Sequence, residues 1–594
     1  MQMDIDRLCL ENAIDRFLKS GKKEDAFDVY FCYLEMFVGN YKHTRRMIEL
    51  LSEFEANGSG LLMKHRDHYV HSVYVFILGL AIYQTNSIYR ATYNKTYNLT
   101  DEHKAAHHYL QYWGMTSLFH DIGYPFELPF EQVASYFEVD GEQREKRPFV
   151  AYHALDSFVK IDKSMARQIA HMYGDKQEAI FETTDELFAY VLSQKLSETY
   201  LFSQEQMLRF LKEKPTQPNK FNHYMDHAYF SATVLFKKLF CEMGCPLHLE
   251  HIDALTAILM HNSLYKFCIA YYKNEKLNIP FEAQKHPLAY MLMLCDELQC
   301  WDRTAYGRNS KKELHPMGCE FVFENDVIKA TYIFDNKQEA KIKAYEAKYE
   351  AWKVQKPQSD DKEVMALWKK QKPKLKAYSG MYEKNAQGVC DLQEDIESIV
   401  NLSKIKLDIN MKLSEKTYTK NRSYLSDSNF INLYHFAVVL NGRWNVMDDW
   451  KKAKEENNEE AFIFDKKREK EFSEAFEKIS LEYKLSNIGQ AKAFASYLDK
   501  IDCFYTDKSV DFALVEQFSE EELMKMGIFE HQRWLQEHYY NCWTYGEPEK
   551  TQRDFLRQHR DMIPEFEISQ GDVTEEVAQK NYERLDKGEQ DKDT

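Results

Sequence analysis

The sequence predicts a mainly α-helical protein that carries a small α/β insertion. Only 13 prolines and 20 glycines occur among 594 residues, which favours helices over β-sandwiches or disordered chain. Residues 61–310 repeat apolar side chains every three to four positions, the spacing of helices with one buried face. Residues 319–335, CEFVFENDVIKATYIFD, instead alternate apolar and polar side chains around a central Glu-Asn-Asp, which predicts a β-hairpin.

The chain is expected to divide into five segments. Residues 1–60 form amphipathic helices that close at the sequence NGSG, because glycine and serine interrupt helices. A helical domain follows over 61–310, and an α/β insertion over 311–475. A helical C-terminal module is expected over 476–568, and the polar residues 569–594 are expected to form a loose tail.

Two parts of the insertion are predicted in more detail. Residues 336–385 are rich in lysine, glutamate and alanine and have few apolar anchors, which is typical of exposed helices or a long solvated insertion. Residues 430–444, FINLYHFAVVLNGRW, are rich in apolar side chains and predict a further strand.

Charge and cysteine usage narrow the classes of function. The formal net charge is −17, which argues against strong nucleic-acid binding, because phosphate backbones require a basic surface. The N-terminus lacks the basic and apolar regions of a signal peptide, and no apolar run approaches the roughly 20 residues of a membrane span. The 11 cysteines are scattered without a CxxC pair, as in reduced intracellular proteins. We expect a cytoplasmic protein that does not bind membranes.

Isolated histidines and aspartates on apolar segments predict a metal centre. The ligands of a metal in a helical domain converge from separate helices, so they occur singly in apolar runs; the pair in LFHDIGYPFE (118–127) is the most distinctive. Burying an aspartate in such runs without a cation would be costly. His68 precedes His71 by one helical turn and is expected to lie beside the ligands or on the surface. The predicted ligands are His71, His120, Asp121, His227, His261 and Asp296.

Mixed imidazole and carboxylate ligands suit Mn, Fe, Co or Zn, and Mg where carboxylates dominate. An aspartate next to a histidine on one turn can give one oxygen to each of two metals. Such a site lowers the pKa of bound water and holds phosphoryl oxygens, so one or two divalent ions are expected. A single histidine on an apolar helix is more often a core residue than a metal ligand. The metal-ligand interpretation becomes the better one only when all six residues are considered together.

The order of His71, His120-Asp121 and Asp296 resembles the HD-domain metal phosphohydrolases over roughly residues 61–310. The segment VHSVYVFILGL resembles the family's first-histidine helix, and LFHDIGYP its defining motif. HPLAYMLMLCDEL resembles the last-aspartate helix of the deoxynucleotide triphosphohydrolase branch. The resemblance implies a two-metal site that includes His227 and His261, with Asp121 as the bridging ligand, and in-line hydrolysis at phosphorus.

The substrate is less defined than the metal site. Many deoxynucleotide triphosphohydrolases carry a second histidine and an acid shortly after the HD motif, but GYPFELPFEQV contains no histidine. Phosphomonoester and phosphodiester hydrolysis therefore remain alternatives. Arg303 follows the last aspartate by seven residues, so both can share one helix face, although a surface ion pair explains it equally well. The candidate catalytic residues are Asp121, His227 and Glu131, and the candidate substrate-binding residues are Tyr124 and Arg303.

The C-terminal segment 530–566 resembles the RyR-type repeat domain, with coverage over 476–568. It combines an Arg-Trp pair with a Trp-Thr-Tyr-Gly turn in EHQRWLQEHYYNCWTYGEPEKTQRDFLRQHRDMIPEF. An aromatic platform beside arginine can stack a base and hold a phosphate, so a nucleotide effector is implied. The alternative is that both tryptophans fill the core of a small domain. The candidate effector-binding residues are Arg533, Trp534, Trp543 and Tyr545.

The pairing of these two domains is similar in plan to the HD component of the Clover antiviral defence system. This resemblance implies a dNTP triphosphohydrolase, similar to dGTPases, that is regulated by a nucleotide, depletes nucleotides during antiviral defence and assembles as a homo-oligomer. The alternatives are an HD phosphodiesterase that acts on a cyclic or linear oligonucleotide signal, a nucleotide sensor without turnover, and an assembly protein that uses the fold as a scaffold.

Overall fold

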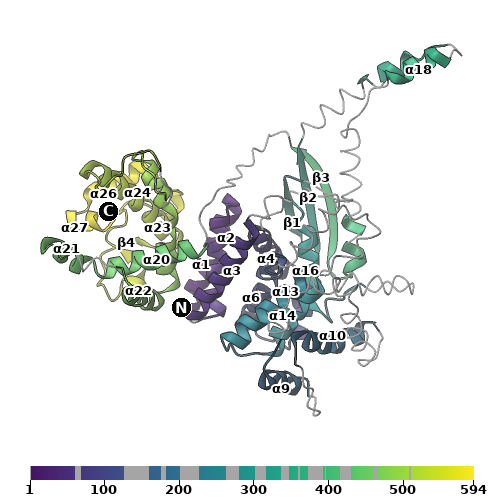
Figure 1. Ribbon diagram of the computed structural model, residues 1–594, viewed down its shortest axis with the longest axis horizontal. Helices are drawn as coiled ribbons and strands as arrows, with labels where there is room; N and C mark the ends of the chain where they lie inside the picture. The colour runs from purple at the N-terminus through teal and green to yellow at the C-terminus, as the bar shows by residue number, and fades with distance from the viewer. Residues whose placement is uncertain are drawn as a thin grey trace. The chain divides into compact units, whose positions relative to one another are not determined.

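The protein is described from a computed structural model (Figure 1). The described residues are 2–39, 41–59, 68–125, 160–174, 182–200, 227–261, 280–301, 316–324, 326–335, 347–348, 350–358, 362–371, 392–394, 396–414, 430–458, 464–506 and 510–593. The chain is mainly helical, as predicted. It forms two compact units, one of Met1–Glu53 with Leu425–Thr594 and the other of Phe54–Tyr424.

The core of the Phe54–Tyr424 unit is a group of mutually packed helices. Within it α14 contacts α6, α13 and α16, and α4 contacts α6 and α16. Helix α13 is buried at all of its positions, which fits its uniformly apolar sequence. The core helices are α4 (His68–Thr85), α6 (Glu102–Leu118), α13 (His227–Phe236), α14 (Leu249–Met260) and α16 (Pro287–Leu298). Around them lie α5 (Ser87–Thr96), α9 (Lys163–Met172), α10 (Thr184–Tyr200) and the π-helix η1 (Lys237–Glu242).

Local sequence sets the position of α6 against α4. Helix α6 begins after Asp101, whose side chain accepts a hydrogen bond from the backbone of Lys104 and so caps the helix. Trp113 of α6 is fully buried, and its indole N–H donates to the carbonyl of Phe76 on α4 at 2.8 Å. The indole lies directly over Gly79, where a β-carbon would come within 2.2 Å of it. Glycine at position 79 therefore allows the close packing of α6 on α4.

A three-stranded sheet belongs to the same unit. Strands β1 (Gly318–Glu324) and β2 (Val327–Asp335) pair antiparallel, which confirms the hairpin predicted over 319–335. Strand β3 (Lys406–Ser414), which the sequence did not predict, pairs parallel to β2 and gives the order β1-β2-β3. Within 336–385, helix α18 (Lys362–Lys370) is mostly exposed, as predicted for its charged sequence.

The second unit joins the two ends of the chain. The N-terminal helices α1 (Gln2–Ser20), α2 (Lys23–Phe37) and α3 (Tyr41–Ser59) confirm the helices predicted for residues 1–60. They do not form a segment of their own: Lys484 of α23 (Leu481–Asp499) pairs with Glu35 at 2.6 Å, and Lys492 pairs with Asp28 at 2.6 Å. These pairs are largely buried, so residues 1–53 are part of the C-terminal unit.

The strand predicted over 430–444 is wrong, because these residues form helix α20 (Phe430–Asn445). The buried positions recur three, four and seven residues apart, the spacing of one helix face, and they include Phe430, Leu433, Tyr434, Ala437, Val438 and Asn441. Further elements of this unit are α21 (Met447–Glu455), α22 (Lys466–Lys478), α24 (Glu520–Tyr540), β4 (Thr544–Tyr545), α25 (Arg553–Leu556), β5 (Gln558–His559) and the 3₁₀ helix η3 (Ile568–Gln570).

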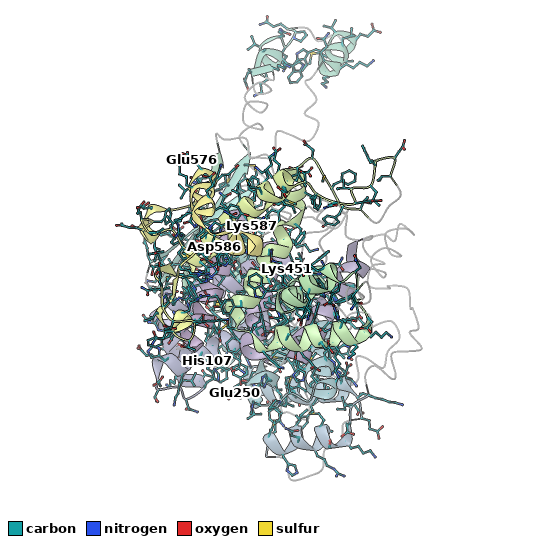
Figure 2. All side chains as sticks on the ribbon, turned by 90° about the vertical axis from the view of Figure 1, so that its left-hand side faces the viewer. His107, Glu250, Lys451, Glu576, Asp586 and Lys587 are labelled. Atoms are coloured by element: carbon teal, nitrogen blue, oxygen red, sulfur yellow. The ribbon has the colours of Figure 1, made fainter. Side chains whose placement is uncertain are left out.

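The loose tail expected over 569–594 is also not what the structure shows. Helices α26 (Glu575–Arg584) and α27 (Lys587–Asp593) form there, and both contact α24. Helix α26 buries only a narrow face, with Ala578 and Tyr582 in it. Most of its surface is polar and exposed, as at Glu576; Figure 2 labels this residue together with the exposed Asp586 and Lys587, which follow α26 in the chain. That composition gave the sequence the appearance of a tail. Among the described residues, no helix has both the length and the apolar character needed to cross a membrane.

Candidate metal centre

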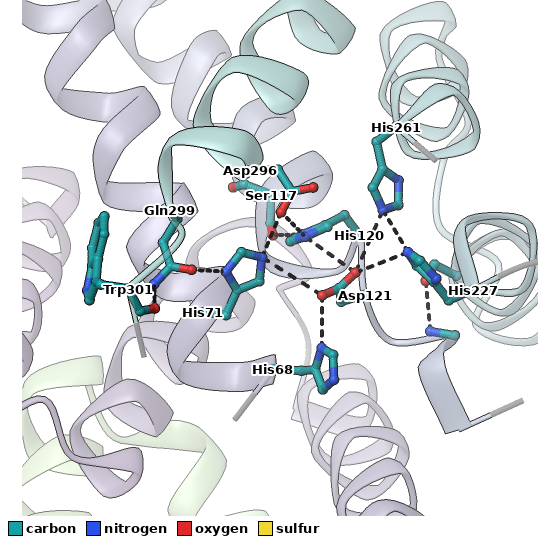
Figure 3. Close-up of polar contacts among 12 residues, drawn as sticks. His68, His71, Ser117, His120, Asp121, His227, His261, Asp296, Gln299 and Trp301 are labelled. Carbon is teal, nitrogen blue, oxygen red and sulfur yellow. Dashed lines mark hydrogen bonds and ion pairs between the residues drawn. The ribbon is translucent and has the colours of Figure 1, made fainter. Parts of the chain in front are cut away.

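The six predicted ligands converge at one place in the helical core (Figure 3). His71 comes from α4, and the pair His120-Asp121 from the turn that follows α6. The other three are His227 at the start of α13, His261 at the end of α14 and Asp296 in the last turn of α16. Five segments far apart in sequence thus bring four imidazoles and two carboxylates together, as a metal site in a helical domain requires.

One set of ligand atoms lies between α4, α6 and α16. Nε2 of His71 is 3.0 Å from Oδ1 of Asp296, and Nε2 of His120 is 3.9 Å from the same oxygen. Ligand atoms of these three residues all lie within 4.8 Å of one another, a spacing that one ion could satisfy.

A second set surrounds the carboxylate of Asp121. Its Oδ1 is 3.5 Å from Nε2 of His120, 3.6 Å from Nε2 of His227 and 3.7 Å from Nε2 of His261. The nitrogens of His227 and His261 are themselves 3.2 Å apart. The other oxygen of Asp121, Oδ2, lies 3.9 Å from Nε2 of His71 in the first set. Asp121 therefore lies between the two sets, where a bridging ligand would be.

Backbone carbonyls fix the orientation of two of the imidazoles. Nδ1 of His120 donates to the carbonyl of Ser117 at 2.7 Å, and Nδ1 of His261 donates to that of Ile258 at 2.6 Å. Because a carbonyl only accepts, the proton of each neutral ring is on Nδ1 and the lone pair of Nε2 faces the centre. This is the arrangement of a metal-binding histidine.

The environment of His120 is the strongest test of whether a cation fits. The residue is fully buried, and its Nε2 has no hydrogen-bond partner in the part of the chain that the structure describes. A buried polar atom without a partner is unusual and needs an explanation. Burial also lowers the pKa of His120, which keeps the ring neutral and able to bind a metal. The residues present fit a divalent ion.

Two further aromatic residues border Asp121. His68, expected beside the ligands or on the surface, is buried and its Nδ1 donates to Oδ2 of Asp121 at 2.9 Å. The ring of Tyr124 lies between His68 and His227, with ring centres 4.1 Å and 4.5 Å away. Tyr124, a candidate substrate-binding residue, thus contacts the centre through the rings of His68 and His227.

The turn that carries the His-Asp pair is seated on α13 through Gly123. Its backbone N–H donates to the hydroxyl of Ser231 at 2.7 Å. A β-carbon at this position would lie 2.2 Å from the carbonyl oxygen of His227 and 2.4 Å from the backbone nitrogen of Ser231. The absence of a side chain at Gly123 therefore sets how closely Asp121 approaches His227.

Sequence reasoning missed Gln299 at this site. Its side chain contacts Nδ1 of His71, as Figure 3 shows. A polar residue three positions after the last predicted ligand was the available signal. The candidate residues Glu131 and Arg303 lie outside the described residues.

The candidate effector-binding residues lie in the other unit and have partners within it. Arg533 forms ion pairs with Glu530 at 2.7 Å and with Glu537 at 2.5 Å, and both carboxylates are largely buried. Trp543 is 1% exposed, packs in a core with Leu535, Tyr539 and Met562, and donates its indole N–H to Glu482 at 2.6 Å. Trp543 thus lies in the core, as the alternative reading supposed.

Two of these candidates remain partly accessible. Trp534 is half-buried, its ring is tilted against that of His538 with ring centres 3.9 Å apart, and it has His559 edge-on at 5.1 Å. The hydroxyl of Tyr545 donates to Glu547 at 2.8 Å, and the guanidinium of Arg584 lies 5.9 Å from its ring centre. Binding of an effector by these residues stays a prediction.

Comparisons with protein-family models, with curated proteins and with solved structures found no match for this chain.

Proposed function

We propose that the protein is a metal-dependent phosphohydrolase of nucleotides, and that its leading activity is dNTP triphosphohydrolysis. The observation that carries the proposal is the buried carboxylate of Asp121 between two sets of ligands, with three imidazole nitrogens within 3.7 Å of one of its oxygens. The order of the ligands along the chain, which resembles the HD-domain phosphohydrolases, supports phosphate chemistry over other uses of such a centre.

The ligands divide the work at this centre. A divalent ion bound there supplies a Lewis acid and a water of lowered pKa. His71, His120 and Asp296 would hold one ion, His227 and His261 a second, and Asp121 would contact both. If a single ion binds, His227 would move a proton, since its ring packs on Tyr124 and its Nε2 lies 3.6 Å from Oδ1 of Asp121. With four imidazoles and two carboxylates, this ligand set suits Mn, Fe, Co or Zn better than Mg, which prefers sites where carboxylates dominate.

The C-terminal module provides regulation in this proposal. In this proposal the accessible part of the half-buried Trp534 stacks on a nucleobase. Trp543 and Arg533 would contribute to that site by supporting it, since the first is in the core and the second is paired with two carboxylates. A cytoplasmic homo-oligomer that depletes nucleotides in antiviral defence is part of the same proposal, through the resemblance in plan.

A substrate panel tests the activity. The pure protein is incubated with Mn²⁺, Mg²⁺ or Co²⁺ and with dNTPs, NTPs and cyclic dinucleotides, each also added as an effector, and the products are separated by ion exchange. Release of intact tripolyphosphate from a dNTP supports the proposal. Cleavage of phosphodiester bonds alone identifies a phosphodiesterase, and nucleotide binding without turnover identifies a sensor.

Asp121→Asn tests whether the metal centre is responsible. The amide keeps the size of the side chain but removes the charge that two cations would share, so turnover should fall by about 10²–10³-fold or more. Asp101→Asn is the matched control, because Asp101 is the exposed cap of α6 and asparagine caps a helix equally well. Equal activity in the wild type and in Asp121→Asn would rule out this centre as the active site.

A further inference from the structure

Gln299 connects the end of α16 to His71 and is only 1% exposed. Its Nε2 donates to the backbone carbonyl of Trp301 at 3.1 Å. Because that carbonyl only accepts, the amide nitrogen has to face Trp301. The amide oxygen Oε1 then faces Nδ1 of His71, 2.5 Å away, as Figure 3 shows.

This orientation determines which nitrogen of His71 carries the proton. An amide oxygen accepts but cannot donate, so Nδ1 of His71 is protonated, and the lone pair of a neutral ring lies on Nε2. Nε2 faces Oδ1 of Asp296 at 3.0 Å. Two acceptors at this distance repel each other unless a cation is bound by both, so the orientation of Gln299 favours metal binding over a direct hydrogen bond between the two ligands.

We propose that Gln299 is a positioning residue that holds His71 as the Nδ1-protonated tautomer for the metal. The backbone carbonyls of Ser117 and Ile258 have this effect on His120 and His261. His71 differs because its partner is a side chain, which a substitution can remove. The proposal rests on the proposed function only in that His71 is a metal ligand.

The three-stranded sheet contacts Leu298 and Trp301, the residues that flank Gln299. The hydroxyl of Tyr332 on β2, a fully buried residue, donates to the carbonyl of Leu298 at 2.7 Å, immediately before Gln299. Trp301, which orients the amide, lies between Tyr74 of α4 at 5.2 Å and Phe321 of β1 at 5.6 Å between ring centres. The end of α16 that holds Asp296 and Gln299 is therefore fixed by β1 and β2.

The other end of α16 is attached to the segment before β3. The hydroxyl of Tyr290 donates to the carbonyl of Asn401 at 3.1 Å, and the backbone N–H of Phe281 donates to Ile399 at 2.8 Å. Both ends of α16 thus contact the insertion. This assigns the sheet a role as a brace for the metal centre.

Metal affinity, measured by titration calorimetry with Mn²⁺, tests the role of Gln299. Gln299→Leu removes the acceptor and should weaken binding by about 10–100-fold, the usual effect of losing a partner of a metal-bound histidine. Gln299→Glu keeps an acceptor for Nδ1 but loses the donor to Trp301, so it should retain more affinity than Gln299→Leu and less than the wild type. Gln536→Leu is the matched control: it removes a glutamine oxygen that accepts from Val573 in the other unit, and should leave affinity unchanged.

Nitrogen NMR of ¹⁵N-ring-labelled histidines separates this proposal from the proposed function. With His71 assigned through a His71→Gln variant, its Nδ1 should be protonated in the metal-free wild type and should lose this preference in Gln299→Leu. If the wild type binds no metal, the proposed function fails, and the NMR result still decides the role of Gln299. Unchanged ring signals together with unchanged metal affinity in Gln299→Leu would overturn the role of Gln299.

A milder pair of variants covers the case in which Gln299→Leu does not fold. Tyr332→Phe removes only the hydroxyl that holds Leu298, and should weaken metal binding measurably. Tyr109→Phe removes an equally buried hydroxyl, which donates to the carbonyl of Gly79 at 3.1 Å, and should not. Equal metal affinities in these two variants would contradict the bracing role of the sheet.

Discussion

Replacing Gly123 by alanine should disrupt the metal centre without replacing a ligand. The new methyl group would lie 2.2 Å from the carbonyl oxygen of His227, 2.4 Å from the nitrogen of Ser231 and 2.8 Å from the β-carbon of Phe230. Two of these atoms belong to the backbone of α13 and cannot turn away. The turn that carries Asp121 and the start of α13 must therefore separate.

The size of the effect follows from these distances. Ordinary contact needs about 3.4 Å, so the two segments have to open by about 1 Å. Overpacking of this kind costs about 1–3 kcal/mol of unfolding free energy. The separation also lengthens the 3.6 Å distance between Asp121 and His227, and a misplacement of about 1 Å can reduce turnover by about 10²-fold.

Urea denaturation, Mn²⁺ titration and the substrate assay measure the three consequences together. Gly318→Ala is the control, because a β-carbon at Gly318 meets only the end of Ile333 at 4.0 Å. Gly123→Ala should lose stability, metal affinity and turnover, while Gly318→Ala should keep all three. Wild-type stability and metal affinity in Gly123→Ala would refute the packing of the His-Asp turn on α13.

Two further predictions concern stability. Burial lowers the pKa of His286 to about 3 and that of His251 to about 4, against about 6.5 in an unfolded chain. Because the unfolded state takes up these protons first, the stability present above pH 6.5 is lost as the pH falls toward 4 and then 3. His286→Gln should flatten this dependence of the unfolding free energy on pH, measured by urea denaturation at several pH values. Equal pH dependence in the variant and the wild type would contradict this. Arg533→Leu leaves Glu530 and Glu537 without their cation and should cost the C-terminal unit about 3–5 kcal/mol in chemical denaturation. A loss below about 1 kcal/mol, with nucleotide binding abolished, would instead assign Arg533 to an effector.

The convergence of the histidines and aspartates of the candidate metal centre was predictable because each of them interrupts an apolar run. His120 and Asp121 are surrounded in sequence by residues that become core, so only a compensating partner explains them. The contact of Gln299 with His71 and that of His68 with Asp121 were harder to predict from the sequence. Both depend on how helix ends meet in three dimensions, and a glutamine after a helix has many other uses.

The errors in the predicted fold have physical causes as well. The run FINLYHFAVVLNGRW contains enough apolar and β-branched residues for a strand, but its burial follows the helical period because α22 and α23 cover one face of it. Helix α26 has a narrow apolar face that becomes visible only against α24. The association of residues 1–53 with the C-terminal unit rests on ion pairs between distant helices, such as Lys484 with Glu35, and local sequence patterns do not indicate which distant charges pair.

The metal content of the wild type and of Asp121→Asn is the most direct test of the central claim. Both proteins are dialysed to equilibrium against Mn²⁺, with Asp101→Asn as the control, and bound metal per chain is measured by plasma mass spectrometry. The geometry around Asp121 predicts one or two ions in the wild type and in the control, and a large loss in Asp121→Asn. No bound metal in the wild type, or equal metal in all three proteins, would contradict a metal centre at Asp121.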